Sequence, residues 1–229
     1  MLLFVHFYEF LLRREILLSG FLQKLYAAYP LPPGIPTRKS VFRVWLGVAL
    51  LNLGGWRFEG QFPDEKKLLV AVAPHTSNWD FVWAVSVMLT LRLRLSFMAK
   101  SSLFTWPFGW LMTKMGGIAI SRDKSYGVVA QMVSRFEQED DLFLALAPEG
   151  TRRRIRQWKT GFLQIAHKAD VPVLLIGVDY KRKRIIIGPC RKISDNTDAE
   201  LRETLRFFAS VSGKHPELCD TSGHSSQEK

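Results

Sequence analysis

The stretch LLVAVA-PHTSNWD-FVWAVSVMLTL, residues 68–91, decides the fold class of this chain. The six continuous apolar residues 68–73 are typical of a strand that is buried on both faces, as strands of parallel sheets are. The longer apolar run 81–91 predicts a helix. The polar residues 74–80 between them then form the turn from strand to helix. This order of elements is the repeating unit of α/β domains.

The same alternation of short apolar runs and longer periodic segments continues along the chain. Further strands are expected at residues 95–99, 117–120, 142–147, 171–178 and 184–187. Two helical faces are expected at Val128, Val129, Met132, Val133 and Phe136, and at Leu201, Leu205 and Phe208. These elements predict an α/β fold with a mixed, largely parallel sheet flanked by helices.

Two local signals refine this prediction. Thr197 and Glu200 have the spacing of a capping box and predict the start of the last helix. The basic run 181–184 lies between two predicted strands and is typical of a solvated hairpin turn.

Composition limits the class of protein. The chain has 229 residues, of which 47% are hydrophobic and 23% charged, and this suits one folded α/β domain with a small appendage. The formal net charge of +11 predicts an anionic partner, and on this ground alone nucleic acid, anionic lipid and a phosphorylated substrate all stay open. Cys190 and Cys219 have no CxxC spacing, which indicates neither a disulfide framework nor a zinc site.

The N-terminal part contains two apolar segments, residues 2–12 and 41–53, separated by the breaker-rich stretch 31–36. Each is shorter than the roughly twenty residues that a membrane-spanning helix needs. Residues 1–55 are therefore expected to form a helical hairpin, which either packs on the main domain or lies in one membrane leaflet. An α/β domain over residues 56–215 and a polar tail over residues 216–229 complete the expected organisation.

Two strand ends carry candidate chemistry. After the strand at residues 68–73, Asp80 is placed to accept a hydrogen bond from one nitrogen of His75 and to leave the other free as a base. After the strand at residues 142–147, the segment 148–154 brings together Glu149, Gly150 and clustered arginines. Each segment alone also fits a structural histidine or an ordinary turn. Sites in open α/β sheets lie at the carboxyl ends of strands, and both segments share that location.

These segments resemble the signature of the glycerolipid acyltransferase family related to 1-acylglycerol-3-phosphate acyltransferase. The family pattern is His-x4-Asp, here His75 and Asp80, followed by a Phe-Pro-Glu-Gly-Thr-Arg block, here residues 147–152 with Ala147 in the place of Phe. Residues 116–122 are similar to the arginine motif that lies between these two blocks, and residues 171–173 resemble the last one. The four motifs occur in the family's order.

The resemblance implies an acyltransferase of bacterial phospholipid biosynthesis. Its catalytic residues would be His75 and Asp80, and its substrate-binding residues Glu149, Gly150, Thr151, Arg152, Arg122 and Lys100. The planar fork of Arg122 and Arg152 suits a phosphate of the acceptor.

The expected partners follow from the same resemblance. The donor would be acyl-CoA or acyl-carrier protein, used as a co-substrate, and the acceptor a lysophospholipid or related glycerolipid. Neither a bound cofactor nor a metal is expected, and neither is nucleic acid. The protein would lie on an anionic membrane surface, at the cytoplasmic face of the inner membrane, as a peripheral or monotopic protein.

Three alternatives stay open. In the first, the acceptor is a neutral glycerol, diol or other lipid. In the second, the dyad activates water and the protein is a hydrolase. In the third, His75 is structural and the chain is a non-catalytic, basic peripheral protein that binds membrane or nucleic acid.

Overall fold

The computed structural model describes residues 31–33, 35, 41–107, 109–120, 125–154, 157–219 and 221. The predicted first arm of the N-terminal hairpin, residues 2–12, and the candidate Arg122 lie outside the described residues. The second arm is described and is helical.

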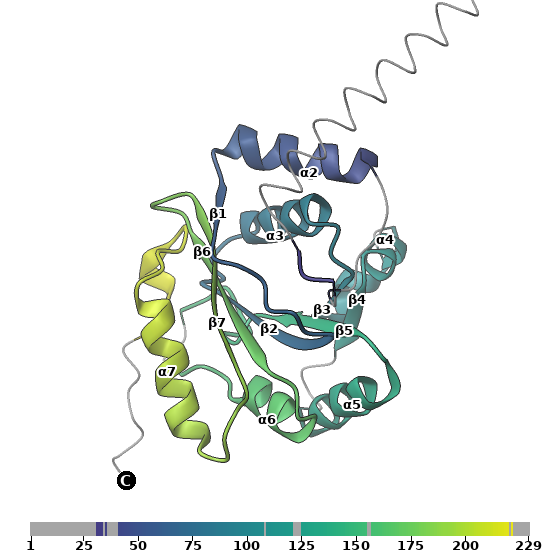
Figure 1. Ribbon diagram of the computed structural model, residues 1–229, viewed down its shortest axis with the longest axis vertical. Helices are drawn as coiled ribbons and strands as arrows, with labels where there is room; N and C mark the ends of the chain where they lie inside the picture. Colours follow the sequence, from purple (N-terminus) through teal and green to yellow (C-terminus); the bar gives the residue numbers. More distant parts are fainter. Residues whose placement is uncertain are drawn as a thin grey trace, which may run out of the picture.

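A seven-stranded sheet forms the centre of the molecule (Figure 1). Its strand order is β1-β7-β6-β2-β5-β3-β4. The strands are β1 (Arg57–Glu59), β2 (Lys67–Ala73), β3 (Leu95–Lys100), β4 (Gly117–Ile120), β5 (Leu142–Leu146), β6 (Val173–Asp179) and β7 (Arg184–Arg191). Every neighbouring pair is parallel except β6 and β7. The prediction of a mixed, largely parallel sheet is confirmed.

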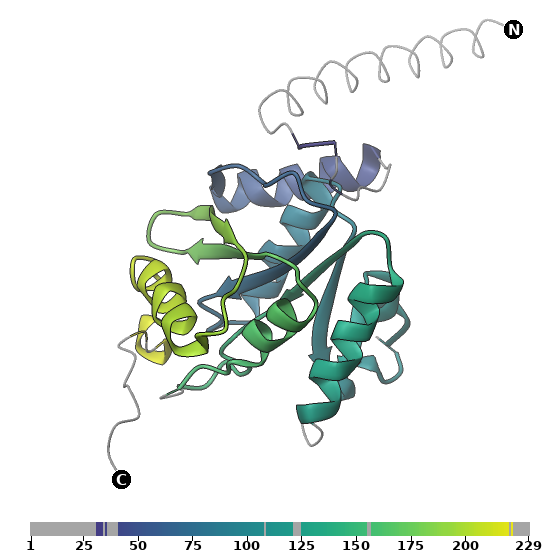
Figure 2. The ribbon, with the colours of Figure 1, turned by 60° about the horizontal axis from the view of Figure 1, so that its bottom comes forward.

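Helices cover both faces of the sheet. One face carries α2 (Val41–Gly54) and α3 (Trp79–Thr90), and the opposite face carries α5 (Ser125–Gln138) and α6 (Gly161–Lys168) (Figures 1 and 2). The other helices of the described residues are α4 (Gly109–Lys114), α7 (Thr197–Ala209) and the short 3₁₀ helices η1 (Ser101–Phe104) and η2 (Pro216–Leu218). The described part is thus a three-layer α/β arrangement.

Successive side chains of the central strands point to opposite faces of the sheet, and they pack in two separate apolar cores, one on each face. In β2, Leu68 and Val70 pack in the core with α3, whereas Leu69 and Ala71 pack in the core with α5 and α6. All four are at most 2% exposed. A strand of this kind must be apolar at every position, which is why residues 68–73 form a continuous apolar run.

The order of the strands creates a switch point beside β2. The chain leaves β2 through α3 towards β3, on one side of the sheet, and leaves β5 through α6 towards β6, on the other side. The loops that follow β2 and β5 therefore diverge onto opposite faces. In open α/β sheets a crevice at such a point is where ligands bind.

Some elements differ from the sequence prediction. β1 was not predicted because three residues with exposed Arg57 and Glu59 carry no periodic signal; its pairing with β7 defines it. The capping-box prediction at Thr197 and Glu200 was wrong. Asn196 is the N-cap and accepts from the Ala199 N–H, whereas the Glu200 carboxylate accepts from Ser194 and pairs with Arg191.

Helix α2 packs closely on α3. Val44, Val48 and Leu51 are buried, and Gly47 faces the α3 backbone at Ser86 and Thr90. No helix among the described residues combines the length and the apolarity that crossing a bilayer requires. Other apolar side chains of α2, namely Phe42, Trp45 and Leu53, are exposed.

The close approach of α2 and α3 at Gly47 gives a stability prediction. A Cβ at Gly47 would lie 2.6 Å from the Thr90 backbone nitrogen and 2.7 Å from the Ser86 carbonyl oxygen. Gly47→Ala should therefore lower the free energy of unfolding by about 1–3 kcal/mol, the usual cost of overpacking. This reverses the gain of ~1 kcal/mol that Gly→Ala gives in an open helix.

The matched control is Gly161→Ala in α6, where an added Cβ meets nothing within 4 Å. Urea unfolding of the two variants should move in opposite directions. Stabilisation of both variants would show that α2 is not seated on α3 as described.

Candidate active site

The predicted site residues gather at one edge of the sheet because the strands that carry them are parallel. His75 follows β2, Glu149 follows β5, and Lys100 ends β3. β2 pairs in parallel with both β5 and β6, and β5 with β3, so their carboxyl ends lie together. Tyr180, directly after β6, joins them at the same edge.

The His75 and Asp80 side chains face each other, as the sequence predicts. Nδ1 of His75 lies 3.3 Å from Oδ2 of Asp80. The His75 side chain is 25% exposed, whereas that of Asp80 is 4% exposed. When Nδ1 carries the proton towards the carboxylate, Nε2 is left with a free lone pair.

Asp80 is a buried carboxylate that accepts several hydrogen bonds. Its Oδ2 accepts from the Ser77 N–H at 2.8 Å, and its Oδ1 accepts from the Tyr180 hydroxyl at 2.6 Å. Burial alone would raise the pKa of Asp80, but the hydrogen bonds from His75, Tyr180 and Ser77 outweigh it and the pKa is lowered. Asp80 is therefore held in its ionised form.

Glu149 holds the loop that carries His75. Both carboxylate oxygens accept from the His75 backbone N–H, at 3.1 and 3.0 Å. The side chain is buried, and burial raises the pKa of Glu149, opposed by the hydrogen bond from His75. The contact joins the β2 and β5 loops across the switch point. A role for Glu149 in binding substrate remains a prediction.

The other predicted substrate-binding residues lie around this contact. Gly150 has φ +66°, in the left-handed region, and a Cβ added there would lie 3.1 Å from the side-chain carbons of Lys159. The Thr151 hydroxyl accepts from the Arg153 N–H. Arg152 and Lys100 are exposed, so both side chains are accessible to a ligand.

A C-terminal strap, residues 211–219, crosses the His75 loop and was not predicted from the sequence. The His215 N–H donates to Thr76 Oγ1 at 3.2 Å, and Cys219 Sγ lies 3.7 Å from Glu149 Oε1. A Cβ at Gly213 would lie 3.0 Å from Pro74 Cβ. Cys219, within the residues expected to form a polar tail, thus contacts the site. No short sequence motif predicts such a contact, because the contact depends on where α7 ends in the folded structure.

Tyr180 was also missed. The signal that could have found it is its position in the fold. Tyr180 is the first residue after β6, a strand that pairs in parallel with β2 and ends beside the His75 loop. In the sequence it only flanks a basic turn.

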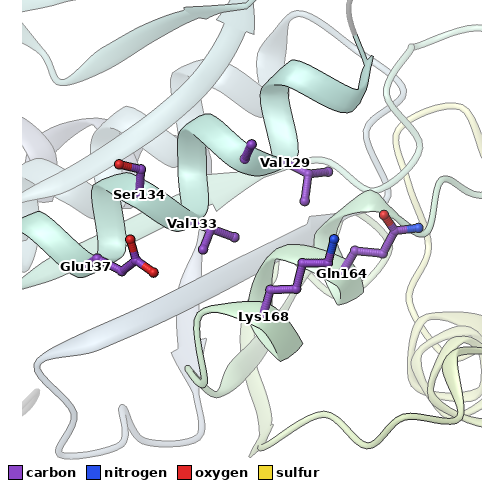
Figure 3. Close-up of a pocket in the computed structure, with 7 residues that line it drawn as sticks. Val129, Val133, Ser134, Glu137, Gln164 and Lys168 are labelled. Carbon is purple, nitrogen blue, oxygen red and sulfur yellow. The ribbon is translucent and has the colours of Figure 1, made fainter.

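Two further features bear on the chemistry. Among the described residues, no group of three or more His, Cys, Asp or Glu side chains is arranged to hold a metal ion. A groove of about 320 Å³ lies between α5 and α6, lined by residues that include Val129, Val133 and Lys168 (Figure 3). None of the predicted site residues lines this groove.

Comparison with known proteins identifies the family of this chain. The family model described as Acyltransferase matches residues 56–179, which contain both loops. The chain belongs to the acyltransferase family. A search of proteins with curated functions gave no significant match.

The fold of this acyltransferase is also similar to that in the crystal structure of the 1-acyl-sn-glycerophosphate (LPA) acyltransferase PlsC from Thermotoga maritima. The TM-score is 0.50 and the sequence identity 18%, over 92% of this chain and 89% of that chain. At this identity the likeness shows a shared fold. The family predicted from the four motifs is confirmed, and so is the fold predicted from the alternation of strands and helices.

The raised pKa of Glu149 gives a prediction on stability against pH. The folded protein binds the Glu149 proton more tightly than the unfolded chain, whose pKa is near 4.5. As pH rises from about 4, the unfolded chain loses this proton first, so this group makes stability fall. Glu149→Gln removes the ionisation and keeps an oxygen that accepts from the His75 N–H.

The unfolding free energy of the variant minus that of the wild type should therefore increase as pH rises from about 4 to about 7. Urea unfolding of both proteins across this range measures it. A difference that stays constant with pH would mean that Glu149 ionises as easily in the folded protein as in the unfolded chain.

Proposed function

We propose that this acyltransferase transfers a fatty acyl group from acyl-CoA or acyl-carrier protein to the free hydroxyl of 1-acylglycerol-3-phosphate. The observation that carries the proposal is the His75–Asp80 pair. A partly exposed imidazole faces a buried, ionised carboxylate through Nδ1, at the carboxyl edge of a parallel sheet. This arrangement leaves Nε2 as a general base.

The reaction needs one proton to move and one acyl bond to be exchanged. Nε2 of His75 takes the proton of the acceptor hydroxyl while the oxygen attacks the thioester carbonyl. The tetrahedral intermediate then collapses, the C–S bond breaks, and the leaving sulfur takes the proton from His75. Asp80 stabilises the imidazolium that exists between these two events.

The thioester explains why no resident cofactor or metal is proposed. A thiolate with an ordinary pKa of about 8.5 is a good leaving group, so a strong separate acid is unnecessary. The donor thus enters as a co-substrate.

Exposed cations at the same edge support a phosphorylated acceptor. Arg152 follows the β5 loop and Lys100 ends β3, which neighbours β5. A guanidinium donates two parallel hydrogen bonds to a phosphate, and Arg152 is the residue proposed for this contact. Arg122, in the arginine motif, is proposed to join it.

The first test removes the base. His75→Ala should lower kcat for transfer from labelled acyl-CoA to lysophosphatidate at least about 10²-fold, and Asp80→Asn should have an effect of similar order. His167→Ala, which removes an imidazole on α6, is the matched control and should stay near the wild-type rate. Circular dichroism checks that each variant folds.

The same assay compares acceptors by the mass of their products. Lysophosphatidate should be used in preference to a monoacylglycerol or a diol, and omitting the acceptor should leave little hydrolysis. Wild-type activity in folded His75→Ala would overturn the proposed mechanism. A preference for the neutral acceptor would overturn the phosphate assignment alone.

We further propose that the protein lies peripherally on the anionic cytoplasmic face of the inner membrane. Helices α2, α3 and α4 lie on the same side of the sheet (Figure 1). Trp79 in α3 and Trp110 in α4 are exposed, and Trp106, just before α4, is 92% exposed. Indole rings favour the interface between lipid and water. The net charge of +11 adds attraction to anionic lipid.

Vesicle binding tests this placement. The double variant Trp106→Ser, Trp110→Ser should bind phosphatidylglycerol-containing vesicles roughly tenfold or more weakly, because burying one large apolar side chain contributes ~1.5–3 kcal/mol. Arg202→Ala, Arg206→Ala on α7 removes two charges and no aromatic ring, and should have a smaller effect. Equal effects of the two double variants in vesicle sedimentation would mean that binding is electrostatic and not directed by this face.

A further inference from the structure

Tyr180 gives Asp80 a third hydrogen-bond partner, which lies outside the His75 loop. Its hydroxyl donates to Oδ1 at 2.6 Å, while the other carboxylate oxygen, Oδ2, faces His75 and accepts from the Ser77 N–H. The two oxygens of Asp80 therefore serve different partners. Rotation of the carboxylate away from His75 would break the contact with Tyr180.

Elements outside the His75 loop hold Tyr180 in place. The rings of Tyr180 and Trp56 pack edge to face, with their centroids 5.0 Å apart. The Tyr180 N–H donates to the Ser212 carbonyl of the strap at 2.8 Å. Its hydroxyl is thus presented to Asp80 by the β6–β7 turn, by Trp56 just before β1 and by the strap, and it also interacts with the side chain of Trp83 in α3.

We propose that Tyr180 is a positioning residue for the acyl transfer, one that keeps Asp80 ionised and turned towards His75. The inference rests on the proposed function, since it assigns Tyr180 a role through the His75–Asp80 pair. Tyr180 lies just beyond residues 56–179, the segment that the family model matches. The residue does not touch the reacting atoms and acts through Asp80.

The protonation states of Asp80 and Tyr180 support this role. Burial favours the neutral form of Asp80, and the hydrogen bond from Tyr180 is one of those that keep its pKa lowered. The same hydrogen bond and burial raise the pKa of Tyr180, with burial the larger cause, so its hydroxyl keeps the proton that it donates. Donor and acceptor each hold the other in the required protonation state.

Other charged groups face this cluster and stay unchanged when only the hydroxyl is removed. Glu149 interacts with both His75 and Asp80 from the β5 loop. Lys183 lies over the Tyr180 and Trp56 rings from the β6–β7 turn, and Lys214 lies over the Trp79 ring from the strap. A shift measured in Tyr180→Phe therefore reports the lost hydroxyl.

The test is the pH dependence of acyl transfer in Tyr180→Phe, which keeps the ring beside Trp56. Without the hydroxyl, the His75–Asp80 pair binds a proton more tightly, so the acidic limb of kcat should move to higher pH. The value of kcat on its plateau should fall roughly tenfold, the scale expected for a hydrogen bond to a charged group. The KM of the acceptor should change little, because Tyr180 does not touch it.

Two comparisons separate positioning from general structural damage. Lys183→Met removes the cation over the ring but keeps the hydroxyl, and its pH profile should match the wild type. Tyr180→Phe added to Asp80→Asn should cause no further loss, because the hydroxyl acts through the carboxylate. An unshifted acidic limb in Tyr180→Phe, or a full additional loss in the double variant, would overturn the proposal. The proposed function is judged separately, by His75→Ala.

Discussion

The burial of the Asp80 charge constrains the rest of this structure. An ionised carboxylate in an apolar interior is stable only when hydrogen bonds replace its water. Those bonds come from the His75 loop, through Ser77 and the imidazole, and from the turn after β6, through Tyr180. The chain therefore has to bring the end of β2, the start of α3 and the end of β6 to one point. Parallel pairing of β2 with β6 does this directly.

A second contact works across the switch point. The loops after β2 and β5 lead to helices on opposite faces, which would separate them, yet the Glu149 carboxylate accepts from the His75 N–H and ties them together. The strap then covers this junction through His215 and Cys219. The imidazole is thus fixed both at its side chain, by Asp80, and at its backbone, by Glu149. A base held in this way loses little freedom when it reacts.

The sequence predicted the parts of this arrangement that are periodic or local. The run 68–73 had to be apolar at each position because both faces of β2 are buried, so its strand was visible. The His75–Asp80 contact spans one turn at a helix start and was equally visible. Tyr180, Ser212 and Cys219 reach the site only through tertiary packing. Neither spacing nor composition encodes that. The capping box at Thr197 failed for a related reason, since Glu200 is used by Ser194 and Arg191 instead.

The pKa values of the two carboxyl groups of the site are shifted in opposite directions, and this distinguishes their roles. Both are buried, but hydrogen bonds hold the pKa of Asp80 low whereas burial leaves that of Glu149 raised. Environments that drive two neighbouring carboxyl groups apart in pKa are how one site keeps one of them charged and the other more easily neutral. The charged one, Asp80, is the partner that a developing imidazolium needs. Glu149 accepts a hydrogen bond from a backbone N–H. Its carboxyl group has an oxygen that can accept this hydrogen bond whether the group is ionised or protonated. The loop can therefore stay in place at a pH where Glu149 has taken up a proton, while the charge that supports His75 remains on Asp80.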